Sequence, residues 1–284
     1  MTASNFVEID NSFQVDPDYQ VGLREVGITS IDSVFSFSQG TDLHKKNLAP
    51  YRTRIEFKIT SPDKTLFLKR YNRPPVLVQL KSWLNHRRRA SLSSFEFEPA
   101  GQLNAAGINA PKTICRGQQW GGLFEKRSFI ITEKIADAQS LEKKLPACFD
   151  EPPSTQNRKL RNEFIDKLAD FVKKFHATNY RHRDLYLCHI FHSADDKFYL
   201  IDLARAFKPN FFAERFRVKD IAQLYYSAPA SKFSRTDRLR FYQQMTGRDK
   251  LTTKDKRFIG KVKNKAKRMA KHDIKHNRNA PFAS

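Results

Sequence analysis

The first half of the chain carries short apolar runs separated by turn-forming residues. Three β-strands are predicted, at 31–37, 53–59 and 65–71, because these runs are short and rich in β-branched and aromatic residues. A largely helical stretch is predicted over 77–104, and a further strand over 129–133. The first half is therefore expected to be β-rich with one helical segment.

The second half shows helical periodicity. One apolar face recurs at i, i+4, i+8, i+11, i+12 and i+15, which predicts an amphipathic helix packed on the core, and its members are Leu160, Phe164, Leu168, Phe171, Val172 and Phe175. A second helix is predicted over Val218–Tyr226, headed by Asp220, and a basic C-terminal helix over about 252–276. We expect an arm at 1–25, a β-rich lobe at 26–133 and a helical lobe at 134–284.

Composition agrees with a globular protein. The chain has 284 residues, of which 39% are hydrophobic, including 24 Phe and 9 Tyr, so it can bury a substantial core. No apolar run approaches the roughly 18 residues of a membrane span, and the first residues do not resemble a secretory signal. Three cysteines form no paired spacing, which favours a reducing cytoplasm over a disulfide framework.

Positive charge is the unusual property of this composition. There are 52 Lys+Arg against 30 Asp+Glu, a net charge of +22, so an anionic partner is expected. Residues 247–284 hold 13 Lys+Arg and 3 Asp, a net of +10, and a second cluster contains Lys81 and Arg87–Arg89. Nucleic acid, an anionic bilayer and a phosphorylated glycolipid all suit this charge, and the C-terminal segment is alternatively a solvated tail.

Two carboxylates give the strongest chemical signal. His182-Arg183-Asp184 begins a stretch similar to the kinase catalytic loop H-R-D-L-x-x-x-N, and Asp202 follows two apolar runs around a polar turn at 194–197. Phosphoryl transfer needs one carboxylate beside the acceptor hydroxyl and another on the metal that bridges the phosphates. Asp184 is the candidate base and Asp202 the candidate Mg²⁺ ligand. The alternatives are a loop or capping aspartate and a turn aspartate.

His189 stands where most kinases place a metal-binding asparagine. We expect it in the metal and phosphate sphere, although imidazole is a less natural Mg²⁺ ligand than an amide oxygen. A zinc site is a weaker alternative, because the spacing H-x5-C-H-x2-H from His182 through Cys188 to His192 matches no common zinc motif. Cys188 is better explained as a small buried residue.

The nucleotide-binding candidates lie in the first half. Lys69 lies near the end of a predicted strand, where a kinase places its phosphate-contacting lysine, although an edge lysine facing solvent fits as well. Its acidic partner is expected on the following helix, with Glu96 favoured over Glu98, and Pro99 complicates that helix because proline is comfortable only in the first turn. A glycine-rich loop is absent, and Gly40 alone permits a tight turn, with Lys45 and Lys46 able to contact phosphate.

These segments together resemble the lipopolysaccharide kinase (Kdo/WaaP) family. The resemblance rests on 179–191 and 200–206, with weaker similarity at 67–69, 104–111 and 131–133. His189 fits the heptose kinase branch, since the Kdo kinase branch more often keeps Asn there. The resemblance implies an α+β, protein-kinase-like fold of two lobes, with a β-rich N-lobe and a mainly helical C-lobe. It also implies ATP and Mg²⁺ as cofactors, and Glu133 joins the nucleotide-binding candidates.

The implied activity is ATP-dependent phosphorylation of a heptose hydroxyl in the lipopolysaccharide inner core. The implied place is the cytoplasmic face of the inner membrane, with the core glycolipid as substrate, the anionic membrane surface as partner and no nucleic acid. The alternatives are a pseudokinase or glycolipid-binding module, and a kinase acting on Kdo, another small molecule or a protein. The presence of Lys69, Asp184 and Asp202 argues against a pseudokinase.

Overall fold

A computed structural model describes residues 6–10, 12–43, 49–150, 154–278 and 281 of the chain. The chain forms two compact units. The first contains residues 1–136 together with 202–204, and the second contains 137–201 and 205–284. The boundary between the units therefore lies close to residue 133, where the sequence predicts the change from a β-rich to a helical lobe. Asp202 belongs to the first unit.

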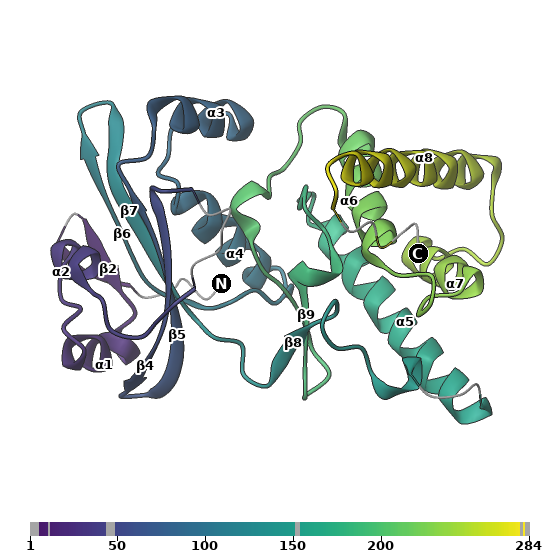
Figure 1. Ribbon diagram of the computed structural model, residues 1–284, viewed down its shortest axis with the longest axis horizontal. Coiled ribbons are helices and arrows are strands. Elements are labelled where there is room, and N and C mark those ends of the chain that lie inside the picture. The colour runs from purple at the N-terminus through teal and green to yellow at the C-terminus, as the bar shows by residue number, and fades with distance from the viewer. Residues whose placement is uncertain (1–5, 11, 44–48, 151–153, 279–280, 282–284) are drawn as a thin grey trace. The chain divides into compact units, whose positions relative to one another are not determined.

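A seven-stranded antiparallel sheet forms the first unit (Figure 1). Its strands in spatial order are β1 (Val7–Asp10), β2 (Phe13–Val15), β6 (Thr113–Gly121), β7 (Phe124–Glu133), β5 (Asp63–Asn72), β4 (Arg52–Thr60) and β3 (Thr41–Asp42). The β4–β5 hairpin turns at Ser61-Pro62, where the sequence predicts it, since Thr60 pairs with Asp63. The strands β3 and β6 were not predicted, and β1 and β2 lie in the segment expected to be an arm or a short edge element.

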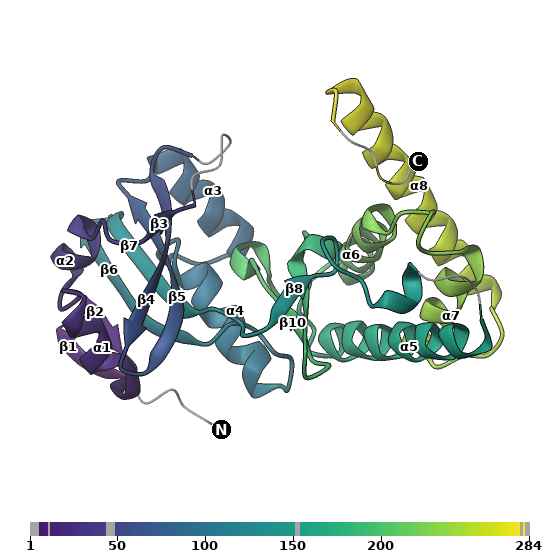
Figure 2. The ribbon, with the colours of Figure 1, turned by 60° about the horizontal axis from the view of Figure 1, so that its bottom comes forward.

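The two faces of the sheet are covered by different helices (Figures 1 and 2). On one face, Leu66 and Leu68 of β5 pack into the core beneath α1 (Gln20–Glu25) and α2 (Ile31–Ser36). Side chains of a strand alternate between faces, so Lys69 and Tyr71 lie on the other face. That face carries α3 (Val76–His86) and α4 (Ser94–Ala105). The alternation along β5 thus assigns Lys69 to the side of α4.

The prediction of a strand over 31–37 is wrong, because this segment is the helix α2. Ser30 starts the helix as an N-cap, accepting a hydrogen bond from the backbone N–H of Ser33 in a capping box. Ile31 and Val34, three positions apart, supply the buried face. A short run of apolar and small polar residues fits the periodicity of a strand as well as that of a helix. Here the N-cap at Ser30 favours the helix.

The helical stretch predicted over 77–104 consists of two helices. Arg87 adopts a left-handed conformation with φ 54°, which ends α3. The chain then bends before α4 starts at Ser94, and Pro99 lies inside α4, where its ring is buried. As a result, α3 and α4 are separate helices on this face of the sheet.

Within the described residues, four helices and a small sheet form the second unit. The antiparallel strands lie in the order β10 (Phe198–Leu200), β9 (Ile190–Ser193) and β8 (Ala138–Ser140), and the helices are α5 (Thr155–Ala177), α6 (Ala213–Ser227), α7 (Arg235–Thr246) and α8 (Thr253–Lys275). On the predicted face of α5, Phe164, Leu168, Val172 and Phe175 are buried, Phe171 is half-buried and Leu160 is 44% exposed. Asp220 does not head a helix, since α6 begins at Ala213. The 3-10 turns are η1 (Pro17–Tyr19), η2 (Ala147–Phe149), η3 (Leu187–His189) and η4 (Leu203–Arg205).

The basic C-terminal segment is largely the helix α8. Its Val262, Ala266 and Ala270 are buried, and Ala266 and Ala270 cluster with Tyr226 of α6. Most of its lysines are exposed. Among the described residues, no helix has the combination of length and apolar character required to span a bilayer.

A cavity of about 610 Å³ lies among the four helices of the second unit. Its walls are largely apolar and include Leu168 of α5, Leu224 of α6, Tyr242 of α7 and Val262 of α8. Leu187, which follows the H-R-D motif, also lines it. The loop that carries the H-R-D motif therefore borders this cavity.

Candidate active site

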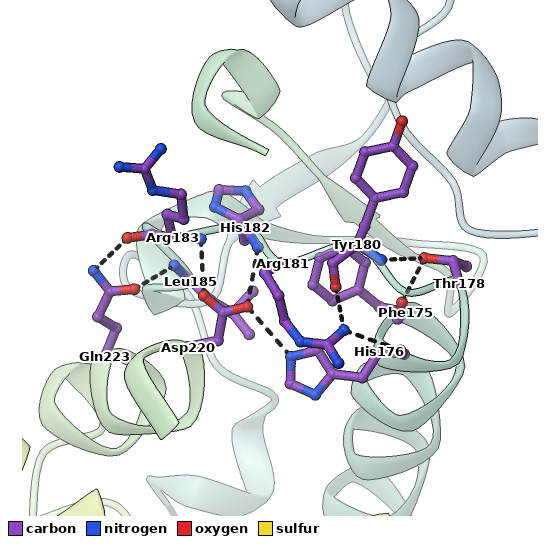
Figure 3. Close-up of polar contacts among 10 residues, drawn as sticks. All are labelled: Phe175, His176, Thr178, Tyr180, Arg181, His182, Arg183, Leu185, Asp220 and Gln223. Carbon is purple, nitrogen blue, oxygen red and sulfur yellow. Dashed lines mark hydrogen bonds and ion pairs between the residues drawn. The ribbon is translucent and has the colours of Figure 1, made fainter. Parts of the chain in front are cut away.

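The loop that carries the H-R-D motif is held by one face of α6 (Figure 3). Asp220, Gln223 and Ser227 are spaced i, i+3 and i+7, which places their side chains on one face of the helix. Together they accept hydrogen bonds from four backbone N–H groups between residues 182 and 187. These side chains of α6 thus satisfy backbone N–H groups of an irregular buried loop.

Asp220 is the centre of this arrangement. Its carboxylate is fully buried and accepts from the backbone N–H of His182 at 2.9 Å and of Arg183 at 2.8 Å. Arg183 has φ 69°, in the left-handed region, and the two charge-assisted hydrogen bonds stabilise that conformation. His176 of α5 adds its Nε2 at 3.3 Å, and burial lowers the pKa of this imidazole, so we assign it as neutral with Nε2 donating.

The two histidines of the loop hold Ile201, the residue that precedes Asp202. The imidazole Nε2 of His182 lies 3.0 Å from the carbonyl oxygen of Ile201, and the N–H of Ile201 donates to the carbonyl of His189 at 3.1 Å. Both polar backbone groups of Ile201 are therefore bound to the loop. His182 therefore has a structural role in holding Ile201, which the H-R-D motif alone does not reveal.

His189 also bonds inside its own loop. Its Nδ1 lies 2.6 Å from the carbonyl oxygen of Asp184, and its ring stacks on that of His182 with centroids 5.7 Å apart. Direct coordination of metal by His189 stays a prediction. Within the described ranges, no three His, Cys, Asp or Glu side chains gather in a way that could hold a metal, so the alternative of a zinc site receives no support.

Asp184 is surrounded by cationic and amide donors from the second unit. Arg205 Nη1 donates to both carboxylate oxygens, at 2.9 and 2.7 Å, and Lys219 Nζ lies 3.9 Å from Oδ1. Gln223 Nε2 approaches Oδ1 at 3.4 Å. Burial lowers the pKa of Lys219. The sequence analysis assigned no role to Arg205 and did not identify Lys219. No local sequence spacing indicates that a lysine of α6 lies beside Asp184.

Lys69 forms an ion pair with Glu96, the partner that the sequence favoured, whereas Glu98 pairs with Arg88. The pair joins β5 to α4, and its two side chains are only 17% and 8% exposed. Nearby Arg52, which the sequence analysis missed, is also half-buried. Burial acts to lower its pKa, but the Tyr71 hydroxyl and the carboxylates of Asp202 and Glu96 outweigh this and raise it.

Gly40 and Glu133 have identifiable structural tasks. Gly40 precedes β3 with φ 105°, and a Cβ there would collide with the backbone oxygen of Glu56, so only glycine fits. The Glu133 carboxylate accepts from the Tyr19 hydroxyl at 2.7 Å and pairs with Lys64 at 2.8 Å. Any nucleotide contact by Glu133 is therefore expected through its backbone. Lys45 and Lys46 lie outside the described residues.

A buried carboxylate holds the segment that leads into α4. Glu125 is 3% exposed and accepts from the backbone N–H of Leu92 at 2.7 Å, two residues before the helix that carries Glu96. Burial raises the pKa of Glu125 to about 7. The folded state therefore binds this proton more tightly than the unfolded state, and the free energy of unfolding falls as pH rises from about 4.5 to 7.

Glu125→Gln is expected to remove this pH dependence. The variant should be more stable than the wild type at pH 8, by an amount on the order of 3 kcal/mol at most, and the difference should shrink toward pH 5. Urea unfolding at the two pH values measures it. Glu142→Gln, which alters an exposed carboxylate, is the matched control. An equal difference between Glu125→Gln and the wild type at both pH values would contradict the assignment.

Lys69 is expected to contribute both to the stability of the fold and to the use of ATP. Lys69→Met leaves the buried Glu96 carboxylate unpaired and should cost about 3–5 kcal/mol of stability, together with a large loss of ATP turnover. Adding Glu96→Gln removes the unpaired charge and should restore most of the stability but not turnover. Steady-state kinetics and unfolding of both variants separate the two effects. Recovery of turnover in the double variant would exclude Lys69 from the nucleotide site.

The loop anchored on a buried helix, the Lys–Glu pair between strand and helix, and the β-rich and helical units define a kinase-like protein. The sequence profile of the lipopolysaccharide kinase (Kdo/WaaP) family matches residues 57–244. The chain belongs to this family. The fold class and the family predicted from the sequence are confirmed.

Curated relatives are lipopolysaccharide core heptose(I) kinases WaaP. The chain is 32% identical to that of Pseudomonas aeruginosa PAO1 over 153 residues, covering 51% of this chain and 56% of the relative. It is 26% identical to that of Escherichia coli K12, covering 75% of this chain and 82% of the relative. The fold also matches a solved structure of WaaP in complex with acyl carrier protein, with a TM-score of 0.63, 22% identity and coverage of 87% and 95%.

Proposed function

We propose that this protein transfers the γ-phosphoryl group of ATP to a heptose hydroxyl of the lipopolysaccharide core. The observation that carries the proposal is the family match over residues 57–244, since it includes Lys69, Glu96, Asp184 and Asp202 together. Heptose is favoured because the curated relatives are named as core heptose(I) kinases. Asp184 would orient the acceptor hydroxyl and accept its proton.

The residues near Asp184 suit an anionic acceptor. Arg205 and Lys219 place two positive charges around one carboxylate, so the surroundings can attract a phosphorylated sugar while Asp184 remains held in position. Gln223 fixes the loop through Leu185 N–H and the Arg183 carbonyl. Charge and orientation are the main means of catalysis in phosphoryl transfer.

The residues present fit ATP and Mg²⁺. The Lys69–Glu96 pair offers an ammonium group of fixed position for phosphate oxygens, and Asp202 offers a hard carboxylate for the metal. When bound, Mg²⁺ would neutralise charge on the phosphates. His189 belongs to the proposed phosphate sphere, and Gly40 and Glu133 to the proposed nucleotide surroundings.

We place the protein at the cytoplasmic face of the inner membrane, bound to the surface and not spanning it. The acceptor is a glycolipid, and anionic lipid attracts basic segments such as α8 at about 1 kcal/mol for each basic residue near the surface. Lys261, Lys267 and Lys271 are among the exposed basic side chains of α8.

The test is incubation of the purified protein with labelled ATP and core-truncated lipopolysaccharide, followed by mass analysis of the core. The expected product is a core one phosphate heavier, with the added group on heptose. Asp184→Asn serves as the inactive control. Absence of transfer to any core acceptor, with nucleotide and glycolipid still bound, would favour the pseudokinase. Transfer to Kdo would retain the kinase and change the substrate.

A further inference from the structure

The helix α3 turns apolar side chains toward solvent. Leu77 and Leu84 are each 79% exposed, Val76 is 44% exposed and Leu80 is 39% exposed. Their positions, i, i+1, i+4 and i+8 from Val76, lie on one face of a helix. The outer face of a surface helix is ordinarily polar, so a continuous aliphatic face in this place needs an explanation.

Polar and aromatic contacts fix the orientation of α3. Gln79, on the opposite face, is 1% exposed, and its Nε2 donates to the carbonyls of Pro74 at 2.8 Å and Glu125 at 3.1 Å. Its Oε1 accepts from the N–H of Glu125 at 2.8 Å. Trp83 stacks on Phe124 with centroids 5.6 Å apart. Rotation that would bury the leucines would break all of these contacts.

Positive charge surrounds the aliphatic face. Residues 64–95 contain no Asp or Glu, Lys81 lies between Leu80 and Leu84, and Arg87–Arg89 follow the leucines along the chain. Arg89 donates to the carbonyls of Gly122 and Leu123, which brings the tip of the β6–β7 hairpin beside the end of the helix. Leu123 is 58% exposed there. We name this surface, Leu77, Leu80, Leu84 and Leu123 with Arg87 and Arg89, the α3 patch.

We propose that the α3 patch inserts into the headgroup region of an anionic bilayer. This inference rests on the proposed attachment to the inner membrane and names the surface that makes it. Aliphatic side chains that protrude from a helix, next to Arg and Lys, are typical of helices that lie in the membrane interface. Two copies of so basic a surface would repel each other, which disfavours self-association.

Both tryptophans of the chain report on this surface. Trp83 belongs to α3, and Trp120 lies beside it with ring centroids 6.4 Å apart. We expect brominated acyl chains to quench the tryptophan fluorescence of the full-length protein when it is mixed with vesicles of equal parts phosphatidylglycerol and phosphatidylcholine. Vesicles of phosphatidylcholine alone should quench much less, and salt should weaken the effect.

Leu77→Glu with Leu84→Glu should lower vesicle binding by about tenfold or more and abolish quenching, because each glutamate meets an anionic surface and an apolar interior. Both leucines are highly exposed, so the fold should be unaffected, and thermal unfolding verifies this. The control, Val21→Glu with Leu160→Glu, changes exposed aliphatic residues elsewhere and should bind and quench as the wild type does. Unchanged quenching in the α3 variant would overturn the proposal.

A second comparison distinguishes α3 from α8. In the α8 variant, Gln replaces Lys261, Lys263, Lys265, Lys267, Arg268 and Lys271, and quenching should persist because both tryptophans and the α3 patch are intact. Loss of quenching in this variant and its retention in the α3 variant would assign the membrane contact to α8. Binding of an acidic protein but not of vesicles would also overturn the inference. Phosphoryl transfer to a soluble, delipidated core should survive in the α3 variant, and its absence from the wild type would contradict the proposed function instead.

Discussion

Asp184→Asn is expected to lower phosphoryl transfer by at least about a thousandfold, because positioning and charge supply most of the catalysis in this reaction. The amide keeps an oxygen that can accept a hydrogen bond from Arg205, which in the wild type donates to both carboxylate oxygens. The change removes the negative charge and the proton acceptor while the loop stays bound to α6. Turnover with a core acceptor and ATP measures the loss, and unfolding should be nearly unchanged.

Asp202→Asn should cause a loss of the same order for a different reason, since it weakens a proposed ligand of Mg²⁺. Asp202 has φ 57°, and asparagine tolerates this left-handed region as well as any residue with a side chain. The backbone therefore gives no reason for a folding defect. Asp195→Asn, in the exposed turn between β9 and β10, is the matched control and should retain full activity. Near-normal transfer by both Asp184→Asn and Asp202→Asn would remove the site from these residues.

The sequence predicted the elements whose signals are local. In the β4–β5 hairpin, Ile55, Phe57 and Ile59 of β4 alternate with polar residues and the turn contains a proline, and the loop with Asp184 has a motif of fixed spacing. The strands β1 and β2 are short, and β6 has a mixed polar sequence that pairs with β2 and β7. Their signal lies in a distant partner, which a single sequence does not show.

The residues that support the candidate site were harder to predict than the candidates themselves. Asp220, Gln223 and Ser227 repeat at i, i+3 and i+7 on a helix whose other inward residues are apolar, and this spacing was available in the sequence. Three buried polar side chains on one helical face need partners, and an irregular loop with unsatisfied backbone groups is a natural one. Arg52 and Lys219 leave no such trace, because their role depends on how separate elements pack.

Asp220→Ala is expected to destabilise the second unit and to abolish turnover. The N–H groups of His182 and Arg183 would lose their acceptor in a buried setting, at about 1–3 kcal/mol for each group. Arg183 would lose the bonds that stabilise its left-handed conformation, so the loop should relax and displace Asp184. Urea unfolding and turnover measure the two effects.

Asp220→Asn separates orientation of the loop from stability. The amide offers one acceptor oxygen where the carboxylate offers two, and its NH₂ group would face a backbone donor or the Nε2 of His176. We expect a smaller loss of stability than in the alanine variant but a loss of turnover of about a hundredfold or more. Glu214→Gln, an exposed change in the first turn of the same helix, should leave both unchanged. An active Asp220→Asn variant of wild-type stability would show that the loop keeps its shape without the Asp220 carboxylate, and hydrogen exchange at His182 and Arg183 would then remain slow.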